Sequence, residues 1–254
     1  YAQLARYLRQ RRWLRPLFAA TGLRTLGLRL CPNPGPRDWK RRFRTLTTLW
    51  DLAPAEVYRR WLGAFMDQNK RRLCTDAFLD QIGSEPSTED RMATRMHEID
   101  HNRAASQPDW IATAAAFDTL TYLPDAVLTK VDRASMAHGL ECRSPFLDHR
   151  VVEFVASLPT EWKLHPMHGS KWILRAACRD LIPDLVYHRG KMGFGSPVGA
   201  WLRGPSSSMM QSVTTPEGVL AEWLNRSVID ELVAEHCSHS VDHTYRLWTL
   251  ACLN

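Results

Sequence analysis

The sequence lacks any long uninterrupted apolar run. No stretch reaches the roughly 18 apolar residues that a membrane-spanning helix needs, although 44% of the 254 residues are hydrophobic. The first residues, YAQLARYLRQRRWLR, also lack the apolar centre and cleavage site of a secretory signal peptide. We therefore predict a globular cytoplasmic protein with no membrane partner. Because the chain begins with Tyr1, we interpret it as a fragment of a longer protein.

Paired cysteines are also lacking. The six cysteines are scattered and form no C-x-x-C pair. In a chain of this size, that pattern favours reduced thiols in a cytoplasm, although the spacing also permits disulfides. They are Cys31, Cys74, Cys142, Cys178, Cys237 and Cys252.

A metal site is not indicated either. The stretch HCSHSVDH, 236–243, holds residue types that bind zinc. However, no second group of Cys or His accompanies it at a regular spacing, as zinc sites require. We predict no metal site and favour a surface turn between two helices.

Acidic residues are scarce in the first part of the chain. Residues 1–75 hold 17 Lys and Arg against 4 Asp and Glu, whereas the remaining residues hold 16 against 23. Such asymmetry can indicate contact with nucleic acid or a membrane surface. The basic part lacks the interleaved aromatic residues of a nucleic-acid groove, so we favour docking on the acidic second half or on another domain. A basic nucleic-acid-binding helical module is the alternative.

Strand signals are few and short, and internal repeats and low-complexity segments are absent. We therefore predict a mainly α fold. Apolar residues recur at helical spacing along much of the chain. The predicted helices lie within 1–30, 37–50, 54–66, 89–104, 109–122 and 217–254.

Capping residues mark further helices in the second half. Pro124 suits the first position of a helix, because its missing N–H would be unpaired there anyway. Gly139 is a natural C-terminal stop. Asp148 and Ser170 can each cap the start of a helix. The helix after Asp148 carries an apolar stripe.

Charged residues surround an apolar face on the helix that starts at Pro124. We expect this face to be buried and the charges beside it to be partly buried and paired, because an unpaired buried charge is costly. Structural ion pairing and catalysis both fit this pattern. The charged residues are Lys130, Asp132, Arg133, Glu141 and Arg143.

A glycine-rich stretch, HRGKMGFGSP at 188–197, predicts a loop. Glycines let backbone N–H groups approach an anion, and Lys191 adds a mobile positive charge. Phosphate or pyrophosphate is the expected ligand of such a loop, although the stretch is not a Walker motif.

Two long segments resemble the synthetase domain of glutamine-hydrolysing asparagine synthetases. They are TYLPDAVLTKVDRASMAHGLECRSPFLDHRVVEF, 121–154, and LHPMHGSKWILRAACRDLIPDLVYHRGKMGFGSPVGAWLRG, 164–204. The closing stretch HTYRLWTLACL resembles the end of that domain. The resemblance implies the helical C-terminal part of an α/β adenine-nucleotide-hydrolase-like (PP-loop ATPase) synthetase domain whose nucleotide-binding sheet is missing.

The resemblance also implies a division of the chain and a reaction. Residues 1–254 would form one partial domain, with a basic helical segment at 1–110, an active-site wall at 111–205 and a helical tail at 206–254. ATP would adenylylate the β-carboxylate of aspartate, and ammonia from glutamine would then give asparagine, AMP and pyrophosphate. ATP and Mg²⁺ would be bound mainly by the missing N-terminal half. An N-terminal glutaminase domain and a homodimer are the implied partners.

Site residues follow from the same resemblance, position by position. Lys191 matches the lysine near the phosphates, where it would neutralise charge on the leaving pyrophosphate. Asp132 and Glu141 match acidic positions of the cleft, suited to the substrate amine or to proton transfer. We expect these three side chains to converge on one cleft. The implied cofactor-binding positions are Lys130, Arg133, Arg143 and Gly193.

The chain also departs from the family pattern. It lacks the pyrophosphate loop Ser-Gly-Gly-x-Asp-Ser and the segment Gly-Gly-Asp-Glu. Gly190 and Met192 flank Lys191 where the family has proline and glutamine. We expect the fragment alone to make no product and the activity to belong to the parent chain. Lactam-forming or other amidating ligases and a non-catalytic scaffold are the remaining alternatives.

Overall fold

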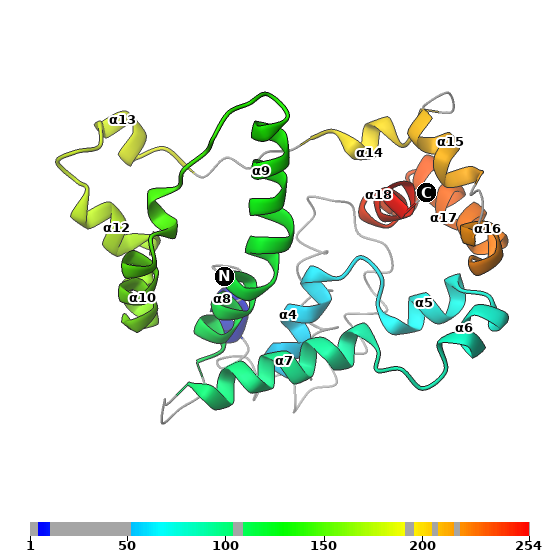
Figure 1. Cartoon of the computed structure of the whole chain (residues 1–254), viewed down its shortest axis with the longest axis horizontal. Helices are drawn as coiled ribbons and strands as arrows, with labels where there is room; N and C mark the ends of the chain where they lie inside the picture. The colour runs from blue at the N-terminus through cyan, green and yellow to red at the C-terminus, as the bar shows by residue number, and fades with distance from the viewer. Residues whose placement is uncertain are drawn as a thin grey trace. The chain divides into compact units, whose positions relative to one another are not determined.

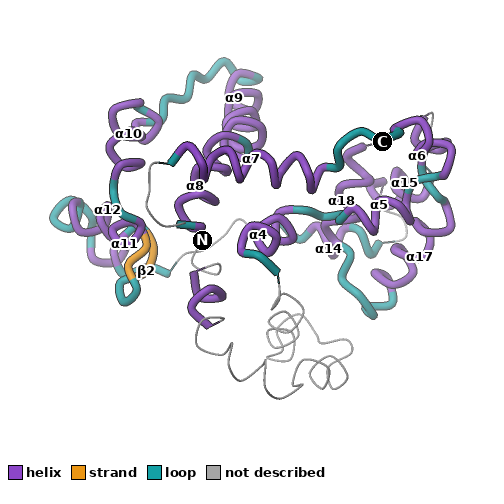
Figure 2. Tube along the Cα trace, turned by 90° about the horizontal axis from the view of Figure 1, so that it is seen from below, coloured by secondary structure: helices purple, strands orange, loops and turns teal. Residues whose placement is uncertain are grey.

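The chain folds into short α-helices, as predicted (Figures 1 and 2). The structure, a computed structural model, describes residues 5–10, 52–103, 109–190, 196–204, 208–215 and 219–253. Within these ranges the strands are limited to one antiparallel hairpin, and no PP-loop sheet is present. No helix in the described ranges has the length and apolar character that crossing a membrane would require.

Two compact units make up the chain. The first unit contains residues 1–10 and 94–192, and the second contains residues 11–93 and 193–254. The helix α7, Thr88–Asn102, passes from the second unit into the first. The predicted divisions at residues 110 and 205 stay predictions.

The first unit holds residues 121–154 and most of the second motif-bearing segment, whose end lies in the second unit. Residues 5–10 are helical. Tyr7 in that helix, Met96 and Ile99 of α7, and Phe117 are each buried. After α7 the elements are α8 (Trp110–Leu120), η1 (Leu123–Leu128), α9 (Thr129–Met136), η2 (Pro145–Leu147), α10 (His149–Ser157), α11 (Thr160–Lys163), β1 (Leu164–His165), β2 (Gly169–Ser170), α12 (Trp172–Ala177) and α13 (Asp184–Tyr187).

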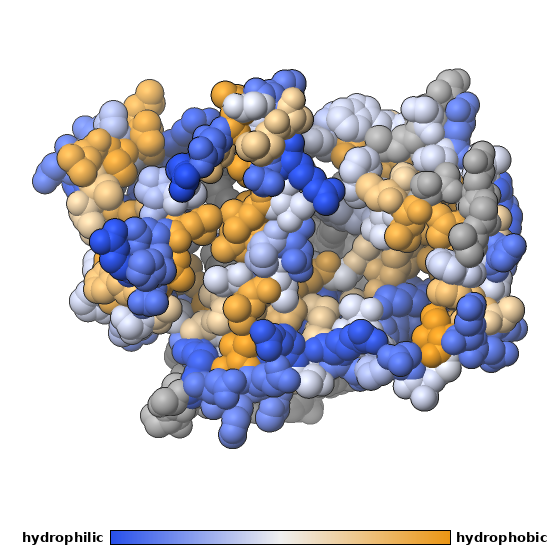
Figure 3. Space-filling view, viewed as in Figure 1, coloured by the Kyte–Doolittle hydropathy of each residue, from blue (hydrophilic) through white to orange (hydrophobic). Residues whose placement is uncertain are grey.

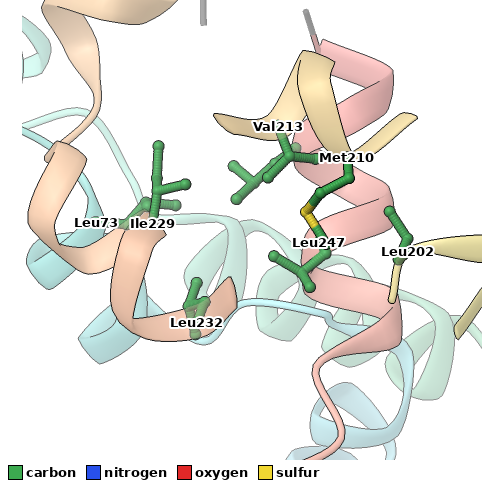
Figure 4. Packing of buried hydrophobic residues seen from close by; sticks show 8 residues of the cluster. Leu73, Leu202, Met210, Val213, Ile229, Leu232 and Leu247 are labelled. Atoms are coloured by element: carbon green, nitrogen blue, oxygen red, sulfur yellow. The ribbon is translucent and has the colours of Figure 1, made fainter. Parts of the chain in front are cut away.

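The second unit contains an apolar core (Figure 4). Its elements are α4 (Pro54–Leu62), α5 (Asp67–Leu73), α6 (Asp76–Ile82), α14 (Val198–Trp201), α15 (Ser208–Thr214), α16 (Val219–Trp223), α17 (Arg226–Cys237) and α18 (Thr244–Leu253). The core joins helices that lie far apart in the sequence, because Leu73 of α5 packs in the same cluster as Ile229 of α17 and Leu247 of α18. Leu202, Met210, Val213, Leu232 and Leu250 complete it.

Most predicted helix starts are confirmed. α4 begins at Pro54, α7 and α8 lie where helical spacing placed them, and three helices occupy the tail. The side chain of Asp148 accepts a hydrogen bond from the Arg150 N–H at 2.9 Å and so caps α10. Gly139 adopts a φ of +66°, in the left-handed region that favours glycine after a helix.

The predicted cap at Ser170 is wrong. Ser170 lies in β2, where it pairs with Leu164 of β1. The residue before α12 is instead Lys171, which has a φ of +59° and makes no side-chain cap. Pairing in the hairpin is a contact between separate segments, and it takes the backbone of Ser170 away from the start of the helix.

The predicted burial of the motif-bearing helices is also wrong. No described residue from 118 to 190 is buried. Val131 on α9 and Phe154 on α10 are exposed, and Figure 3 shows apolar side chains at the surface of the region that holds α9, α10 and α12. Trp172 of α12 contacts the Trp162 ring of α11, but none of the three helices has a buried residue, so much of their apolar surface stays exposed.

Other predictions fall partly or wholly outside the described residues. The predicted helices at 1–30 and 37–50 lie outside them except for residues 5–10, and so does Cys31. The remaining cysteines are free thiols: Cys74, Cys142, Cys178, Cys237 and Cys252.

Candidate active site

A π-helical turn leads into the helix that carries Asp132. Pro124 stands at the start of η1, and both the N–H and the hydroxyl of Thr129 donate to its carbonyl oxygen, the hydroxyl at 2.8 Å. This i→i+5 pattern is the π-helical one, and single π turns are frequent at functional sites. The turn runs directly into α9, which carries the candidate charged residues Lys130, Asp132 and Arg133.

The charged side chains of α9 are exposed. Lys130, Asp132 and Arg133 all face solvent, which corrects the expectation that they would be partly buried. No ion pair joins any of these three to another described residue. The hydroxyl of Ser135 donates to the backbone carbonyl of Asp132 at 3.2 Å. This bond does not involve the carboxylate of Asp132, which stays open to a ligand.

Glu141 and Arg143 are paired, as expected, but they are not buried. A nitrogen of the Arg143 guanidinium lies 2.5 Å from Oε1 of Glu141, with the two side chains 86% and 70% exposed. An exposed pair contributes only about 0–1 kcal/mol. A ligand with a stronger charge can therefore displace either partner at little cost.

Asp148 has the structural role that we expected. Besides capping α10, its carboxylate accepts hydrogen bonds from the Arg150 guanidinium at 2.7 and 3.0 Å. Those bonds lower the pKa of Asp148. The residue ends the segment that holds Glu141 and Arg143.

Two of the predicted site residues, Lys191 and Gly193, lie outside the described residues. The convergence of Lys191 with Asp132 and Glu141 on one cleft therefore stays a prediction. Asp132 and Glu141 themselves belong to the first unit and are separated by the turn around Gly139, where the Leu140 N–H donates to the Ser135 carbonyl at 3.0 Å.

A partly buried polar cluster in the first unit escaped the sequence analysis. Asp109 caps α8 by accepting from the N–H groups of Ile111 and Ala112, both at 3.1 Å. Its other oxygen accepts from the Thr160 hydroxyl at 2.5 Å. The fully buried hydroxyl of Thr113 donates to Asp100 at 3.1 Å. Only the Asp before an Ala-rich run signalled this cluster, which fixes α7, α8 and α11 together.

A second buried cluster replaces the predicted surface turn at 236–243. The turn between α17 and α18 exists, but His236 and His243 are buried. Nε2 of His243 lies 2.6 Å from a carboxylate oxygen of Glu235. His239 is exposed with a φ of +60°. His236 and His243 are therefore structural.

The fit of ATP and Mg²⁺ to this chain can be judged from its charges. Exposed cations on α9 and beside Glu141 suit a polyphosphate. A metal ion fits less well. Among the described residues, no group of three Asp, Glu, His or Cys side chains lies close enough together to hold one. We therefore assign no Mg²⁺-binding role to the described residues.

Comparison with known proteins agrees with the motifs. The family model described as asparagine synthase matches residues 4–254. The glutamine-hydrolyzing asparagine synthetase 1 of Bacillus subtilis is 29% identical over 134 residues, which are 52% of this chain and 21% of that protein. The glutamine-hydrolyzing asparagine synthetase of Gallus gallus is 39% identical over 82 residues, 31% of this chain and 14% of that protein.

One of the relatives, from a fungus, is not named as an asparagine synthetase. The amidase chyE of Penicillium rubens is 32% identical over 113 residues, 42% of this chain and 17% of that protein. No solved structure matched the chain. The aligned regions thus span about a fifth or less of the length of these curated relatives.

An exposed, charged helix follows a π turn in the helical first unit. The chain belongs to the asparagine synthase family, with distant homology to glutamine-hydrolysing asparagine synthetases over part of their length.

Proposed function

We propose that this chain forms one wall of the synthetase site in a longer protein that makes asparagine from aspartate, with ATP and glutamine-derived ammonia as co-substrates. The observation that carries the proposal is the family match along residues 4–254, which includes every motif-bearing segment. The names of the Bacillus and Gallus relatives supply the reaction.

Exposure of the charged residues supports this assignment. A structural ion-pair network would be shielded and self-satisfied, whereas Asp132 is unpaired among the described residues and the Glu141–Arg143 pair is open to solvent. In the proposed site, Asp132 and Glu141 bind the substrate amine or take up a proton. Arg143, freed from Glu141 by a ligand, turns to a phosphate oxygen.

Lys191 completes the proposed chemistry. Its ammonium neutralises the charge that develops on pyrophosphate as the acyl-adenylate forms. Lys130 and Arg133 lie one turn or less from Asp132 on α9 and organise the carboxylates of the site when the substrates bind. Gly193 allows a backbone N–H to approach the phosphates. Each role is an expectation carried over from the motif positions.

The open apolar surface supports a larger parent domain. Residues from 118 to 190 have no buried member, although this stretch includes exposed Leu140, Phe146 and Phe154. Apolar surface on this scale stabilises a fold only when another surface covers it. We infer that a nucleotide-binding part of the parent protein covers these helices, with a glutaminase domain supplying the ammonia.

A second candidate function is amide formation on a carboxylate other than that of aspartate. The fungal relative named amidase chyE suggests it, because its name is not that of an asparagine synthetase although its match covers 42% of this chain. Assays of the parent protein with aspartate and with other small carboxylates decide between the two, since the preferred substrate gives the higher kcat/KM.

The test uses the full-length protein that contains this chain. Lys191→Ala is expected to lower asparagine and AMP formation at least about a hundredfold, because removing one transition-state charge partner costs that much. Glutamine hydrolysis stays near the wild-type rate. Lys70→Ala, a lysine of α5 in the second unit, is the matched control and leaves both activities intact.

A second arm tests the carboxylates. Asp132→Asn and Glu141→Gln alter exposed side chains, so unfolding free energy changes by less than about 0.5 kcal/mol. Synthesis falls at least about tenfold if these groups contact substrate. Wild-type synthesis in Lys191→Ala together with both carboxylate variants would rule out the proposed site.

A further inference from the structure

Two histidines of α7 stand one turn apart on the same exposed face of the helix. His97 and His101 both belong to the first unit and are four residues apart. Side chains at this spacing leave a helix in nearly the same direction, about 6 Å apart along its axis. The two imidazole rings follow this geometry, because their planes are 12° apart and their centroids are separated by 6.4 Å.

Neither imidazole is engaged elsewhere in the described part of the chain. Both side chains are exposed, and no hydrogen bond or ion pair joins either ring to another described residue. Exposed side chains change rotamer within nanoseconds. The rings of His97 and His101 can therefore turn until one nitrogen of each faces the same point in solvent.

A second pair of histidines in the first unit is bound into its surroundings. Nδ1 of His165 accepts the backbone N–H groups of Met167 and His168 at 3.1 and 3.2 Å. The other nitrogen of that ring then carries the proton and has no lone pair to offer. The His165 ring also packs on Trp172, with centroids 5.0 Å apart. A metal ion would have to break this turn, whereas His97 and His101 have no such bonds to lose.

The ligand atoms of the pair on α7 select a class of metal ion. Imidazole nitrogens suit borderline divalent transition metals such as Zn²⁺, Cu²⁺ and Ni²⁺. Mg²⁺ takes oxygen ligands, so the pair is no site for the Mg²⁺ that accompanies ATP. His101 lies in the last turn of α7, where the negative end of the helix dipole favours a cation.

The carboxylates between the two histidines favour binding over catalysis. The stretch HEIDH, 97–101, fits the H-E-x-x-H pattern, in which two histidines hold zinc and the glutamate acts as a general base. Here Glu98 pairs with Arg95 at 3.0 Å, and Asp100 accepts from the Thr113 hydroxyl at 3.1 Å. No third Asp, Glu, His or Cys joins the pair among the described residues. We therefore assign no hydrolytic role to this stretch.

We propose that His97 and His101 form a two-histidine chelate site for a divalent transition metal ion on the surface of α7, with water completing its coordination. The two nitrogens reach one ion only while this part of the chain is helical, so a bound ion holds the last turn of α7 in place. The inference does not depend on the proposed synthetase function.

Titration of the metal-free full-length protein with Cu²⁺ tests the site. Cu²⁺ is the probe because it binds most strongly among the divalent first-row metals. His97→Gln and His101→Gln are each expected to weaken the binding of one ion at least about tenfold, since a second linked ligand acts through its effective concentration. His168→Gln, also at an exposed position, is the matched control and keeps the wild-type affinity.

A variant that keeps both imidazoles tests their spacing. His101→Asn combined with Asn102→His moves one ring by about 100° around α7 without changing the composition. Both positions are exposed, so the fold tolerates the exchange. We expect this variant to bind Cu²⁺ as weakly as His101→Gln. Wild-type affinity in the exchanged variant would overturn the chelate site, and so would wild-type affinity in both glutamine variants.

Hydrogen exchange gives a second readout that requires no count of bound ions. Saturating Zn²⁺ is expected to slow amide exchange across residues 97–102 severalfold in the wild type, because the ion binds the helix and not its frayed end. The exchanged variant should show no such protection. Equal protection in the two proteins, or none in the wild type, would contradict a metal clip on α7.

Discussion

Nε2 of His236 lies 3.1 Å from the carbonyl oxygen of Gly199, so a fully buried imidazole joins α17 to α14. Nδ1 of the same ring accepts the backbone N–H of His243 at 3.2 Å. One ring nitrogen must therefore donate and the other accept, which defines the neutral Nε2–H tautomer. Protonation of Nδ1 would break the bond to His243.

The pH dependence of stability follows from this burial. Burial lowers the pKa of His236, as do Arg203 and His243, while the hydrogen bond to Gly199 and the charge of Asp242 oppose the shift. The unfolded chain then binds a proton that the folded chain does not. Stability from this group is complete above the ordinary pKa of about 6.5 and declines as the pH falls below it, by at most about 1.4 kcal/mol per pH unit.

Denaturant unfolding between pH 7.5 and pH 5 measures this contribution. His236→Gln keeps an N–H for Gly199 and cannot titrate, so its unfolding free energy depends less on pH than that of the wild type. His138→Gln, at an exposed position, keeps the wild-type dependence. Equal slopes for His236→Gln and the wild type would show that His236 does not carry the effect.

The link between Asp109 and Thr160 predicts coupled stability losses. Asp109→Ala removes both a helix cap and the partner of the Thr160 hydroxyl, and is expected to cost about 1–3 kcal/mol. Asp109→Asn keeps an oxygen for the cap and costs less. In a double-mutant cycle with Thr160→Val, the coupling free energy is about 0.5–3 kcal/mol. Additive losses would contradict a direct bond.

Gly139 tests the turn between α9 and Glu141. A Cβ at this position would meet nothing within 4 Å, so the only penalty of Gly139→Ala is its φ of +66°. The expected loss is about 1–2 kcal/mol of unfolding free energy. Gly190→Ala also has open space and no positive φ, and serves as the control. Equal stability of the two variants would exclude backbone strain at Gly139.

Leu247 tests the core of the second unit. It is fully buried, so Leu247→Ala should lower the unfolding free energy by about 2–5 kcal/mol through lost burial and a cavity. Tyr245 lies on the same helix and is 80% exposed, so Tyr245→Ala should change it by less than about 0.5 kcal/mol. Denaturation midpoints compare the two, and a Leu247→Ala variant as stable as the wild type would place Leu247 outside the core.

Local patterns were enough to predict the family and much of the helical structure. The motifs around Asp132 and Glu141, the Pro54 helix start, the Asp148 cap and the turn at Gly139 all depend on residues close together in the chain. Capping, helical periodicity and left-handed glycine turns involve only a few neighbouring residues. The sequence alone therefore determined them.

Contacts between distant segments decided the rest. Pairing of Ser170 with Leu164 moved the start of α12 to Lys171, and packing of α17 against α14 buried His236 beside Gly199. The apolar face of α9, which includes Val131, was expected to be buried, but Val131 is exposed. Burial depends on which segments meet in space, and apolar spacing shows only which face of a helix is available for contact. Tertiary structure therefore decided that His236 and His243 stabilise the second unit while the charged side chains of α9 remain exposed to solvent.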